Sequence, residues 1–516
     1  MVLGALASQV ASTPWSFLLS GLLGGALLLR QAARLLDRLW RGPRRLERAL
    51  RAQGLRGTPY RFLTGDLKEH GRANREAWSR PLPLRCHDIA ARVAPFVHGA
   101  VREHGAVCFT WFGPMPRVTI TDPDLARDVM SNKFGHFEKP KFPALSKLFA
   151  EGVANYEGEK WVKHRRILNP EFHLEKLKAH GAQSLGPDGS CELDVEPELQ
   201  TLTGDVISRT AFGSSYLEGR KIFQMQNEQA KRLMSIIQKF GIPGYMSLPT
   251  KNNRRMSQIK NEVETILRGL IGKRMQAMKE GEPTKDDLLL GILLESNMRD
   301  TDGNGQSSLG MTIEDVMEEC KLFYFAGMET TSVLLTWTMI LLSMHPEWQD
   351  RAREEVIGLS GKNRPEYDGL SRLKIVTMIL HEVLRLYPPA IAFSRKTYKE
   401  MVIGDATYPA GVILELPVLF IHHDPEIWGS DAHEFRPERF AEGMAMASRG
   451  RLAFFPFGWG PRICIGQNFA LLEAKMALSM ILQSFEFELA PAYTHAPHTL
   501  IMLRPMHGAQ IKLRAI

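Results

Sequence analysis

Residues 454 to 470 read FFPFGWGPRICIGQNFA, which places Cys464 among glycines, an arginine and aromatic residues. The chain has five cysteines, at positions 86, 108, 191, 320 and 464, and no two of them form a C-x-x-C pair. This scatter excludes a zinc ribbon and a thioredoxin-like motif, and it argues against a secreted disulfide framework. Cys464 is therefore a buried packing residue or a functional lone thiolate.

The residues around Cys464 favour the thiolate. They form the pattern Phe457-x-x-Gly460-x-Arg462-x-Cys464-x-Gly466, and the helix-forming stretch QNFALLEAKMALSMIL follows. Glycines let backbone amides turn toward the sulfur, and the start of the following helix favours negative charge on it. Such a loop suits a thiolate that holds a haem iron from one side, with the apolar Phe457 beside it.

This stretch resembles the cysteine loop of the cytochrome P450 family, and further motifs follow the family's order. Residues 382–385, EVLR, resemble its E-x-x-R helix motif, and residues 435–440, FRPERF, resemble its P-E-R-F segment. The resemblance implies that Glu382, Arg385 and Arg439 form a buried charge network beneath haem b. Their role would be folding and haem retention, because a buried charge that loses its partner costs about 3–5 kcal/mol.

A long helix is predicted between Thr312 and Pro346. Thr312 and Asp315 form a capping-box pattern, and no proline interrupts the chain before Pro346. The helix is apolar nearly all round and should therefore be buried. A second membrane span is the alternative, but Lys321 and Glu329 inside the apolar stretch argue against it.

Residues 326–331, AGMETT, lie at the middle of this helix and resemble the family's oxygen-activating sequence. The resemblance implies that Gly327 leaves room for dioxygen, that Thr330 hydrogen-bonds the bound oxygen and that Glu329 relays protons from solvent. The alternative is a Thr330 hydroxyl bonded to the carbonyl of residue 326, with Glu329 on a solvated face.

Four residues are expected to hold the haem propionates. Trp161-x-x-x-Arg165 resembles the family's propionate motif, and Arg462 and Arg395 would serve the same purpose. Arginine suits this role because its planar fork pairs with carboxylates through two hydrogen bonds. Nearby, Lys160, Lys163 and Arg166 form either a docking surface for a reductase or an ordinary solvated face.

The N-terminus reads as a membrane anchor. Residues 1–29 contain no Asp, Glu, Lys or Arg, whereas residues 30–61 contain ten arginines and only two acids. By the positive-inside rule this arm is cytosolic, and a buried N-terminal helix is the alternative. The arm alone accounts for the net charge of +8, so the basic composition indicates a partner membrane surface and no nucleic acid.

The predicted architecture is mostly α-helical with a smaller β-sheet region, a cytochrome P450 fold behind a transmembrane helix. Residues 105–121 and about 391–416 read as strands. The predicted divisions are an anchor at 1–29, a basic hinge arm at 30–61 and a catalytic domain at 62–516. Pro43 and Pro59, with Gly54 and Gly57, are expected to break the arm into a hinge.

Residues 30–516 resemble a plant membrane-bound clan that includes secologanin synthase and several terpenoid and hormone oxidases, in stretches such as RAQGLRGTPYRFLTGD and NYEGEKWVKHRRILNPEFHLEKLK. Relatives would place a helix around 173–190, but residues 179–190, AHGAQSLGPDGS, are too short and glycine-rich to supply one. We expect an otherwise intact but less stable fold.

The resemblance implies a haem-thiolate monooxygenase on the cytosolic face of the endoplasmic reticulum, with NADPH-cytochrome P450 reductase as electron donor. Dioxygen and a small apolar substrate would meet under the long helix, against Phe323, Phe325, Ala326 and residues 390–394 and 499–502. Two alternatives are a haem-binding protein impaired by the short 173–190 segment, and a haem-thiolate isomerase or dehydratase that needs no reductase.

Overall fold

The computed structural model describes residues 15–131, 137–141, 146, 148–169, 190–212, 216–239, 242–280, 289–298 and 310–516. The longer helices in these ranges are α2 (Trp15–Leu36), α3 (Gly42–Ala52), α4 (Leu67–Trp78), α6 (Pro95–His104), α7 (Pro123–Ser131), α10 (Gly158–Leu168), α11 (Val195–Phe212), α12 (Tyr216–Ser235), α13 (Lys251–Lys279), α14 (Leu289–Met298), α15 (Ile313–Met344), α16 (Pro346–Ser360), α17 (Tyr367–Arg372), α18 (Lys374–Leu386) and α22 (Gln467–Ser484). The shorter ones are α5 (Ala90–Val93), α9 (Gly152–Asn155), α19 (Val418–His422), α20 (Pro425–Trp428) and α21 (Met444–Ala447), with 3₁₀ turns η3 (Ile237–Lys239), η4 (Tyr245–Ser247), η5 (Pro437–Phe440) and η6 (Gly460–Arg462).

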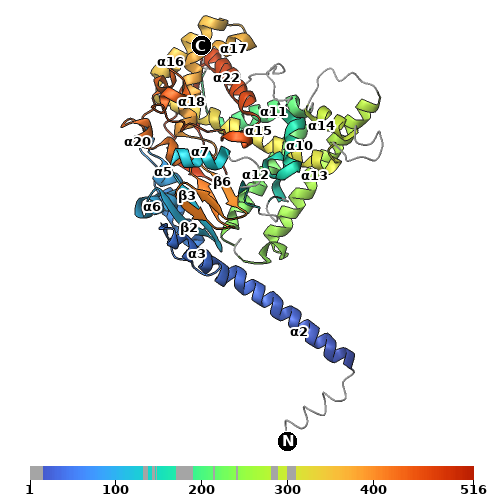
Figure 1. The fold of residues 1–516 in the computed structure, drawn as a ribbon. Helices are drawn as coiled ribbons and strands as arrows, with labels where there is room; N and C mark the ends of the chain where they lie inside the picture. The colour runs from blue at the N-terminus through green and yellow to red at the C-terminus, as the bar shows by residue number, and fades with distance from the viewer. Residues whose placement is uncertain are drawn as a thin grey trace.

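Strands form one larger and three small sheets. The larger sheet has the order β1 (Arg56–Gly57), β2 (Val107–Phe112), β3 (Met115–Ile120), β9 (Ile413–Leu416), β6 (Phe393–Thr397) and β4 (Phe137–Glu138). The small sheets pair β10 (Phe485–Leu489) and β5 (Ser190–Asp194) with β13 (Gln510–Ala515), β11 (Pro497–Thr499) with β12 (Leu503–Pro505), and β7 (Met401–Ile403) with β8 (Ala406–Tyr408). The strands predicted in 105–121 and 391–416 are confirmed, and the chain is mostly helical (Figure 1).

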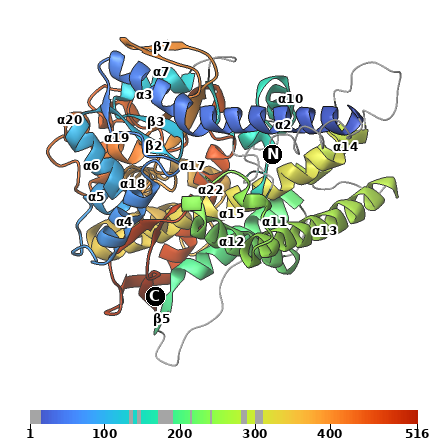
Figure 2. The same cartoon turned by 90° about the horizontal axis from the view of Figure 1, so that it is seen from below.

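Helix α15 runs through the middle of the molecule and joins its two helical cores. The Thr312 hydroxyl accepts the Asp315 N–H at 3.1 Å and the Asp315 carboxylate accepts the Thr312 N–H at 3.4 Å, so the predicted capping box is confirmed. Its first half packs against α10 to α14, and its second half packs against α16, α18 and α22. Figure 2 shows α11 to α14 on the opposite side of the molecule from strands β2 and β3.

The prediction that this helix is buried is also confirmed. Among the residues that the structure describes, α15 alone has the length and hydropathy to cross a membrane, and 78% of its most apolar window is buried inside the protein. Such burial is that of a core helix, because the neighbouring helices already cover its apolar surface.

The arm after residue 30 differs from the expected hinge. Helix α2 continues past Arg30 to Leu36, a π-helical segment, η1 (Asp37–Arg41), follows, and α3 begins at Gly42. Pro43 lies in the first turn of α3, where a proline needs no hydrogen-bonded N–H, so it does not break the helix. The chain turns at Gly54, one of the four residues expected to break the arm, whose φ of 79° favours glycine.

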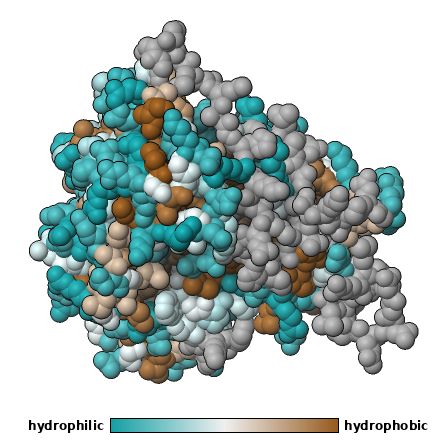
Figure 3. Space-filling model, turned by 90° about the horizontal axis from the view of Figure 1, so that it is seen from above, coloured by the Kyte–Doolittle hydropathy of each residue, from teal (hydrophilic) through white to brown (hydrophobic). Residues whose placement is uncertain are grey.

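Helix α3 docks on the sheet region while α2 projects away from the body (Figure 1). Leu50 is buried in the same core as Phe109 and Trp111 of β2. By contrast, α2 exposes a run of leucines, at positions 19, 22, 23, 27, 28 and 29. On the opposite face of the molecule, the part that grey atoms leave visible is mainly hydrophilic (Figure 3).

The predicted loss of a helix around 173–190 concerns residues that lie, up to residue 189, outside the described ranges. Helix α10 ends at Leu168 before this stretch, and β5 begins at Ser190 after it. The missing helix therefore stays a prediction.

Candidate active site

Two adjoining cavities lie between helix α15 and the Cys464 loop. One has a volume of about 440 Å³ and the other of about 210 Å³. Both are lined by Phe323 and Ala326 of α15, by Phe393 of β6 and by Cys464. The sequence motifs at 326–331 and 457–466 are thus brought together across one internal space.

The cysteine loop is held by backbone contacts that demand glycine. The Cys464 N–H donates to the Phe457 carbonyl at 2.9 Å, which closes the loop on itself. Gly460 has a φ of 72°, and a Cβ there would lie 2.6 Å from the carbonyl oxygen of Met130 in α7. A side chain at residue 460 would therefore push the loop away from α7.

The electrostatics of Cys464 fit a cation-binding thiol. Its side chain is exposed, and it lines both cavities. Burial raises the pKa of the Cys464 thiol, while the Gly466 N–H, Arg165 and Lys139 act in the opposite direction. A thiolate is favoured here once a cation such as a haem iron stands in the cavity.

The larger cavity has a cationic rim. It is lined by Lys139, Trp161, Arg165, Arg395 and Arg462, and its described lining residues include no Asp or Glu. Burial, together with neighbouring arginines, lowers the pKa of Lys139 to about 7.

Each predicted propionate residue lies on this rim. Arg165 Nη1 donates to the Ile463 carbonyl at 3.0 Å, and Arg462 stacks on the Trp161 ring with its guanidinium carbon 4.4 Å from the ring centre. Arg462 also donates to the Tyr156 carbonyl at 2.8 Å and pairs with Glu157. Burial and the Arg462 charge lower the pKa of Arg395 to about 10. Excess buried positive charge beside a thiol fits a dianionic macrocycle with a cysteine-bound iron, so these residues suit haem.

The α15 wall presents Thr330 and Gly327 to the smaller cavity. The Thr330 hydroxyl donates to the Ala326 carbonyl at 2.7 Å, which is the first half of the alternative raised by the sequence. A Cβ at Gly327 would lie 2.8 Å from the Ile207 side chain of α11. Gly327 therefore also permits the close crossing of α11 and α15.

Glu329 points away from both cavities. It is buried, which rules out the solvated face of that alternative, and its Oε1 accepts from Arg504 Nε at 2.7 Å. Arg504 in turn donates to Glu196 Oε1 at 2.9 Å. Burial raises the pKa of Glu196 to about 7, with Arg504 opposing that shift. One arginine of the C-terminal hairpin thus joins α15 to the start of α11.

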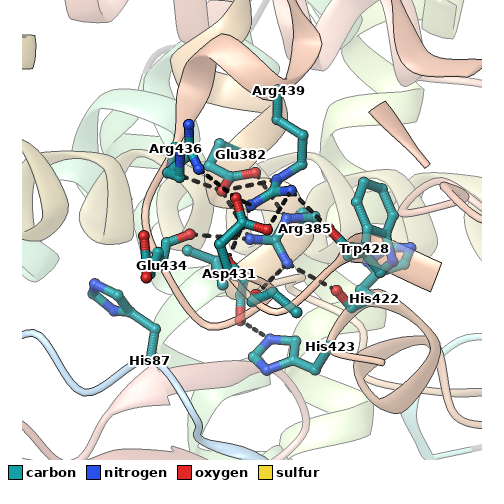
Figure 4. Close-up of polar contacts among 12 residues, drawn as sticks. His87, Glu382, Arg385, His422, His423, Trp428, Asp431, Glu434, Arg436 and Arg439 are labelled. Carbon is teal, nitrogen blue, oxygen red and sulfur yellow. Dashed lines mark hydrogen bonds and ion pairs between the residues drawn. The ribbon is translucent and has the colours of Figure 1, made fainter. Parts of the chain in front are cut away.

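The predicted charge network is present around Arg385 (Figure 4). Glu382 and Arg385 are both 0% exposed and form two hydrogen bonds of 2.8 Å. Arg439 Nε lies 3.7 Å from Glu382 Oε1, and its other nitrogens reach Asp431 and the Trp428 carbonyl. The Arg436 N–H also donates to Glu382, at 2.9 Å. The sequence did not indicate Asp431.

Backbone carbonyls complete this network and connect it to the cysteine loop. Arg385 Nη1 donates to the carbonyls of His422 and Ala432, at 2.9 and 2.6 Å. His422 then accepts the Phe455 N–H on its Nε2 at 3.2 Å. Phe455 lies at the beginning of the cysteine loop, so the buried ion pair positions the loop through His422.

Several site residues were missed by sequence reasoning. Lys139 and Glu157 lie on or behind the cationic rim, and Arg504 and Glu196 hold Glu329. None of them belongs to a motif, and each meets its partner only through tertiary packing. The one signal available was the unpaired charge of Glu329 in an apolar helix, which demands a buried partner.

The predicted substrate contacts divide between two places. Phe323, Ala326, Ala390 and Phe393 line the smaller cavity. Phe325 instead lies beside Glu329 with Leu500 and Ile501. The two groups are therefore on different sides of α15's oxygen motif.

A family model described as cytochrome P450 matches residues 90–512. The protein named cytochrome P450 CYP72A616, from Paris polyphylla, is 57% identical over an alignment that covers 100% of this chain and 99% of that relative. Cytochrome P450 72A15 from Arabidopsis thaliana is 52% identical, with 93% and 95% covered. Echinocystic acid 23-monooxygenase from Saponaria officinalis is 48% identical, with 95% and 97% covered.

Among solved structures, retinoic acid-bound cyanobacterial CYP120A1 superimposes with a TM-score of 0.69 over 83% of this chain and 96% of that chain. Its sequence identity of 21% limits this likeness to the fold.

Lys139 gives a test of the cationic rim. We expect Lys139→Met to speed transfer of haem to an excess of a haem-scavenging protein about tenfold, because a charge-assisted hydrogen bond contributes roughly 1.5 kcal/mol or more. Lys141→Met is the matched control, since Lys141 is exposed and pairs with Glu138 at 3.3 Å.

The same experiment has a pH signature. Without a carboxylate partner Lys139 has a pKa of about 7, and a bound propionate would raise it. Haem affinity from this contact is therefore full below pH 7 and falls as the pH rises above 7. Wild type should lose haem faster at pH 8.5 than at pH 7 by a larger factor than Lys139→Met; equal factors would contradict the assignment.

Proposed function

The chain belongs to the cytochrome P450 family, and we propose that within this family it is a membrane-anchored enzyme acting on a bulky apolar terpenoid or hormone-like substrate. As a cytochrome P450 it is a monooxygenase with haem iron as cofactor. One oxygen atom enters a C–H bond of the substrate, and the other takes up two protons and two electrons and leaves as water. The observation that carries the proposal is that Cys464 and Thr330 both line the smaller, apolar cavity, which adjoins the larger cavity with the cationic rim.

Bound haem supplies the one-electron and dioxygen chemistry, with electron donation from the Cys464 sulfur. The protein's own residues shape the space around it. Phe457 and Ile465 flank the cysteine, and Leu334, Ala390 and Phe393 close the smaller cavity with apolar surface. This surface excludes bulk water and favours an apolar substrate over a polar one.

Thr330 and Glu329 are the groups that would deliver protons. The Thr330 hydroxyl lies on the cavity wall, and its proton is committed to the Ala326 carbonyl at 2.7 Å. Rotation about the Cα–Cβ bond would free this hydroxyl to donate into the cavity. Glu329 would then supply a new proton to the Thr330 hydroxyl, but only after its carboxylate leaves Arg504. The ion pair with Arg504 thus keeps the Glu329 carboxylate outside the cavity until that exchange takes place.

Electrons would come from NADPH through NADPH-cytochrome P450 reductase, as in the membrane-bound members that the sequence resembles. The basic residues near Trp161 were candidates for its docking surface. Lys160 pairs with Asp315 at 2.6 Å, which favours a structural role for that residue. Arg166 remains available for docking on this side of the protein.

The relatives support the substrate class. The protein 48% identical to this chain is named for oxidation of echinocystic acid, a triterpenoid. The smaller cavity, about 210 Å³ and mostly apolar in its lining, suits part of such a molecule. An aliphatic ring system is therefore the substrate that we favour.

Helix α2 supports the anchor. Its uncharged part, residues 15–29, rises about 22 Å of a hydrocarbon core about 30 Å thick, and in the sequence residues 1–14 before it are uncharged as well. We propose a single pass in the endoplasmic reticulum membrane with the body on the cytosolic side.

In isolated microsomes, protease added without detergent should digest the body of the protein, because the body would face the outside of the vesicles. Protection of the body from the protease would contradict this orientation.

The test of the function is product analysis after co-expression with the reductase, using triterpenoid and gibberellin-like substrates. We expect a hydroxylated product that requires both NADPH and reductase, and a red-shifted thiolate-type Soret band after reduction under carbon monoxide. Cys464→Ser should abolish the band. Product formation without reductase would instead favour an isomerase or dehydratase.

An impaired haem-binding protein is the second candidate. The alignment with the Paris polyphylla relative spans 529 positions, and this chain has 516 residues, so it has no residue at 13 or more of them. A shortened 173–190 segment would account for gaps of this number. A normal carbon monoxide spectrum without any NADPH-dependent product would support this candidate.

Glu329 and Glu196 form a matched pair of variants, because both carboxylates bind Arg504. We expect Glu329→Gln to lower the rate of product formation about 10²-fold, to lower product per NADPH consumed and to enlarge the solvent isotope effect, as loss of a general acid would. Glu196→Gln should change these quantities little. Equal effects of the two variants would show that the ion pair is purely structural.

A further inference from the structure

Three side chains that do not line the haem site lie close together beside the Glu382–Arg385 network. Asp88 precedes α5, His423 follows α19, and His433 lies between α20 and η5. Each offers one ligand atom, and these atoms lie within 4.8 Å of one another. Residues from three separate segments thus converge at one place.

His423 is the buried member of the group and has an orphaned nitrogen. The side chain is 4% exposed, and its Nε2 lies 2.9 Å from the Leu386 carbonyl, to which it donates (Figure 4). This bond places the ring's proton on Nε2 and leaves the lone pair on Nδ1. In the described part of the chain, that buried Nδ1 has no hydrogen-bond partner. Burial and the Arg385 charge hold the pKa of His423 well below its ordinary value, so the ring stays neutral.

A metal-ligating histidine has this same arrangement. Its second nitrogen donates to a carbonyl or carboxylate, which fixes the tautomer and the orientation of the ring. A buried ring nitrogen with a free lone pair is costly to leave unsatisfied, unless a ligand completes it. The Leu386 carbonyl and the free Nδ1 therefore point to a bound cation.

The other two groups supply complementary ligands. The His433 ring centre lies 5.6 Å from that of His423, and its Nε2 lies 3.8 Å from Asp88 Oδ1. That distance is too long for a hydrogen bond, so the two side chains approach without satisfying each other. Both are partly open to solvent, which leaves a path for an ion and a position for a water ligand.

We propose that Asp88, His423 and His433 form a binding site for one divalent transition-metal ion, and we expect that ion to be Zn²⁺. Two imidazoles, one carboxylate and a water make a tetrahedral set that zinc favours. Mg²⁺ and Ca²⁺ prefer sites built from oxygen ligands and should bind poorly.

A metal ion at this site would hold separate segments of the chain together. Ala432 and Glu434, on either side of His433, give their carbonyls to Arg385, and so does His422 beside His423. A metal at this point would tie the loop before α5 to the segment that surrounds Arg385. It would stabilise the folded protein through the network that positions the cysteine loop, and it would take no part in the oxidation.

Zinc binding is tested on the haem-loaded, full-length protein without an affinity tag, in detergent. Free Zn²⁺ is set with a competing chelator, and binding is followed by calorimetry and by the midpoint of thermal unfolding. We expect one zinc ion per chain and a higher midpoint in its presence, because a ligand that binds only the native state stabilises it. Mg²⁺ at the same concentration should leave the midpoint unchanged.

Asp88→Asn and His433→Gln should each weaken zinc binding at least about tenfold. Because both side chains are partly exposed, neither variant should shift the midpoint in the absence of zinc. His507→Gln, which removes an exposed histidine elsewhere, should bind zinc like the wild type. The proposal is overturned if zinc does not bind, if the Asp88 and His433 variants bind as tightly as the wild type, or if His507→Gln loses as much affinity as they do.

Discussion

The buried ion pair between Glu382 and Arg385 is the constraint on which the site depends. The Arg385 side chain donates to both Glu382 oxygens and to the carbonyls of His422, Ala432 and Glu434. A pair of this kind contributes little net stability over an apolar substitute, yet losing one partner costs about 3–5 kcal/mol. The ion pair therefore matters more for the geometry of the site than for the stability of the protein. It fixes irregular backbone, and through His422 it fixes the start of a cysteine loop that has little regular secondary structure to hold its shape.

Helix α15 supplies the opposing wall, and its position follows from local chemistry. The Thr312–Asp315 capping box sets where the helix begins and therefore which residues face the cavity. Gly327 lets α11 cross closely, and Thr330 can turn its hydroxyl outward only by giving up the Ala326 carbonyl. The acid of the same motif is held outside the cavity by Arg504. In the proposed mechanism Glu329 therefore lies apart from the cavity where its proton would be used, and an exchange of hydrogen bonds would have to connect the two.

The features that could be predicted from the sequence are those that short stretches of residues encode. The cysteine loop, the capped helix, the E-x-x-R pair and Trp161 with Arg165 all combine residues a few positions apart, where helix and loop geometry is nearly fixed. The roles of the E-x-x-R pair and of Trp161 with Arg165 came from the resemblance to the family. The partners of Glu329 were not predictable, because Arg504 lies 175 residues away and meets it only after the C-terminal hairpin packs on α15. The prediction that Pro43 breaks the arm was wrong for a different reason. The rule that proline interrupts a helix does not hold in a first turn, and the sequence did not reveal that a new helix begins there.

A helix lost after α10, as the sequence predicts, would matter less for the cationic rim than its place in the chain suggests. The rim residues Trp161 and Arg165 belong to α10, which is bound to α15 by contacts of its own. His164 Nδ1 lies 2.7 Å from Glu319 Oε1 with both side chains buried, and Lys160 reaches Asp315 at 2.6 Å. Both partners of α10 stand on the first half of α15, whose start is fixed by the capping box. A helix lost beyond Leu168 would remove apolar packing but leave these polar contacts in place. The loss should therefore lower the stability of the protein more than it disturbs the cationic rim.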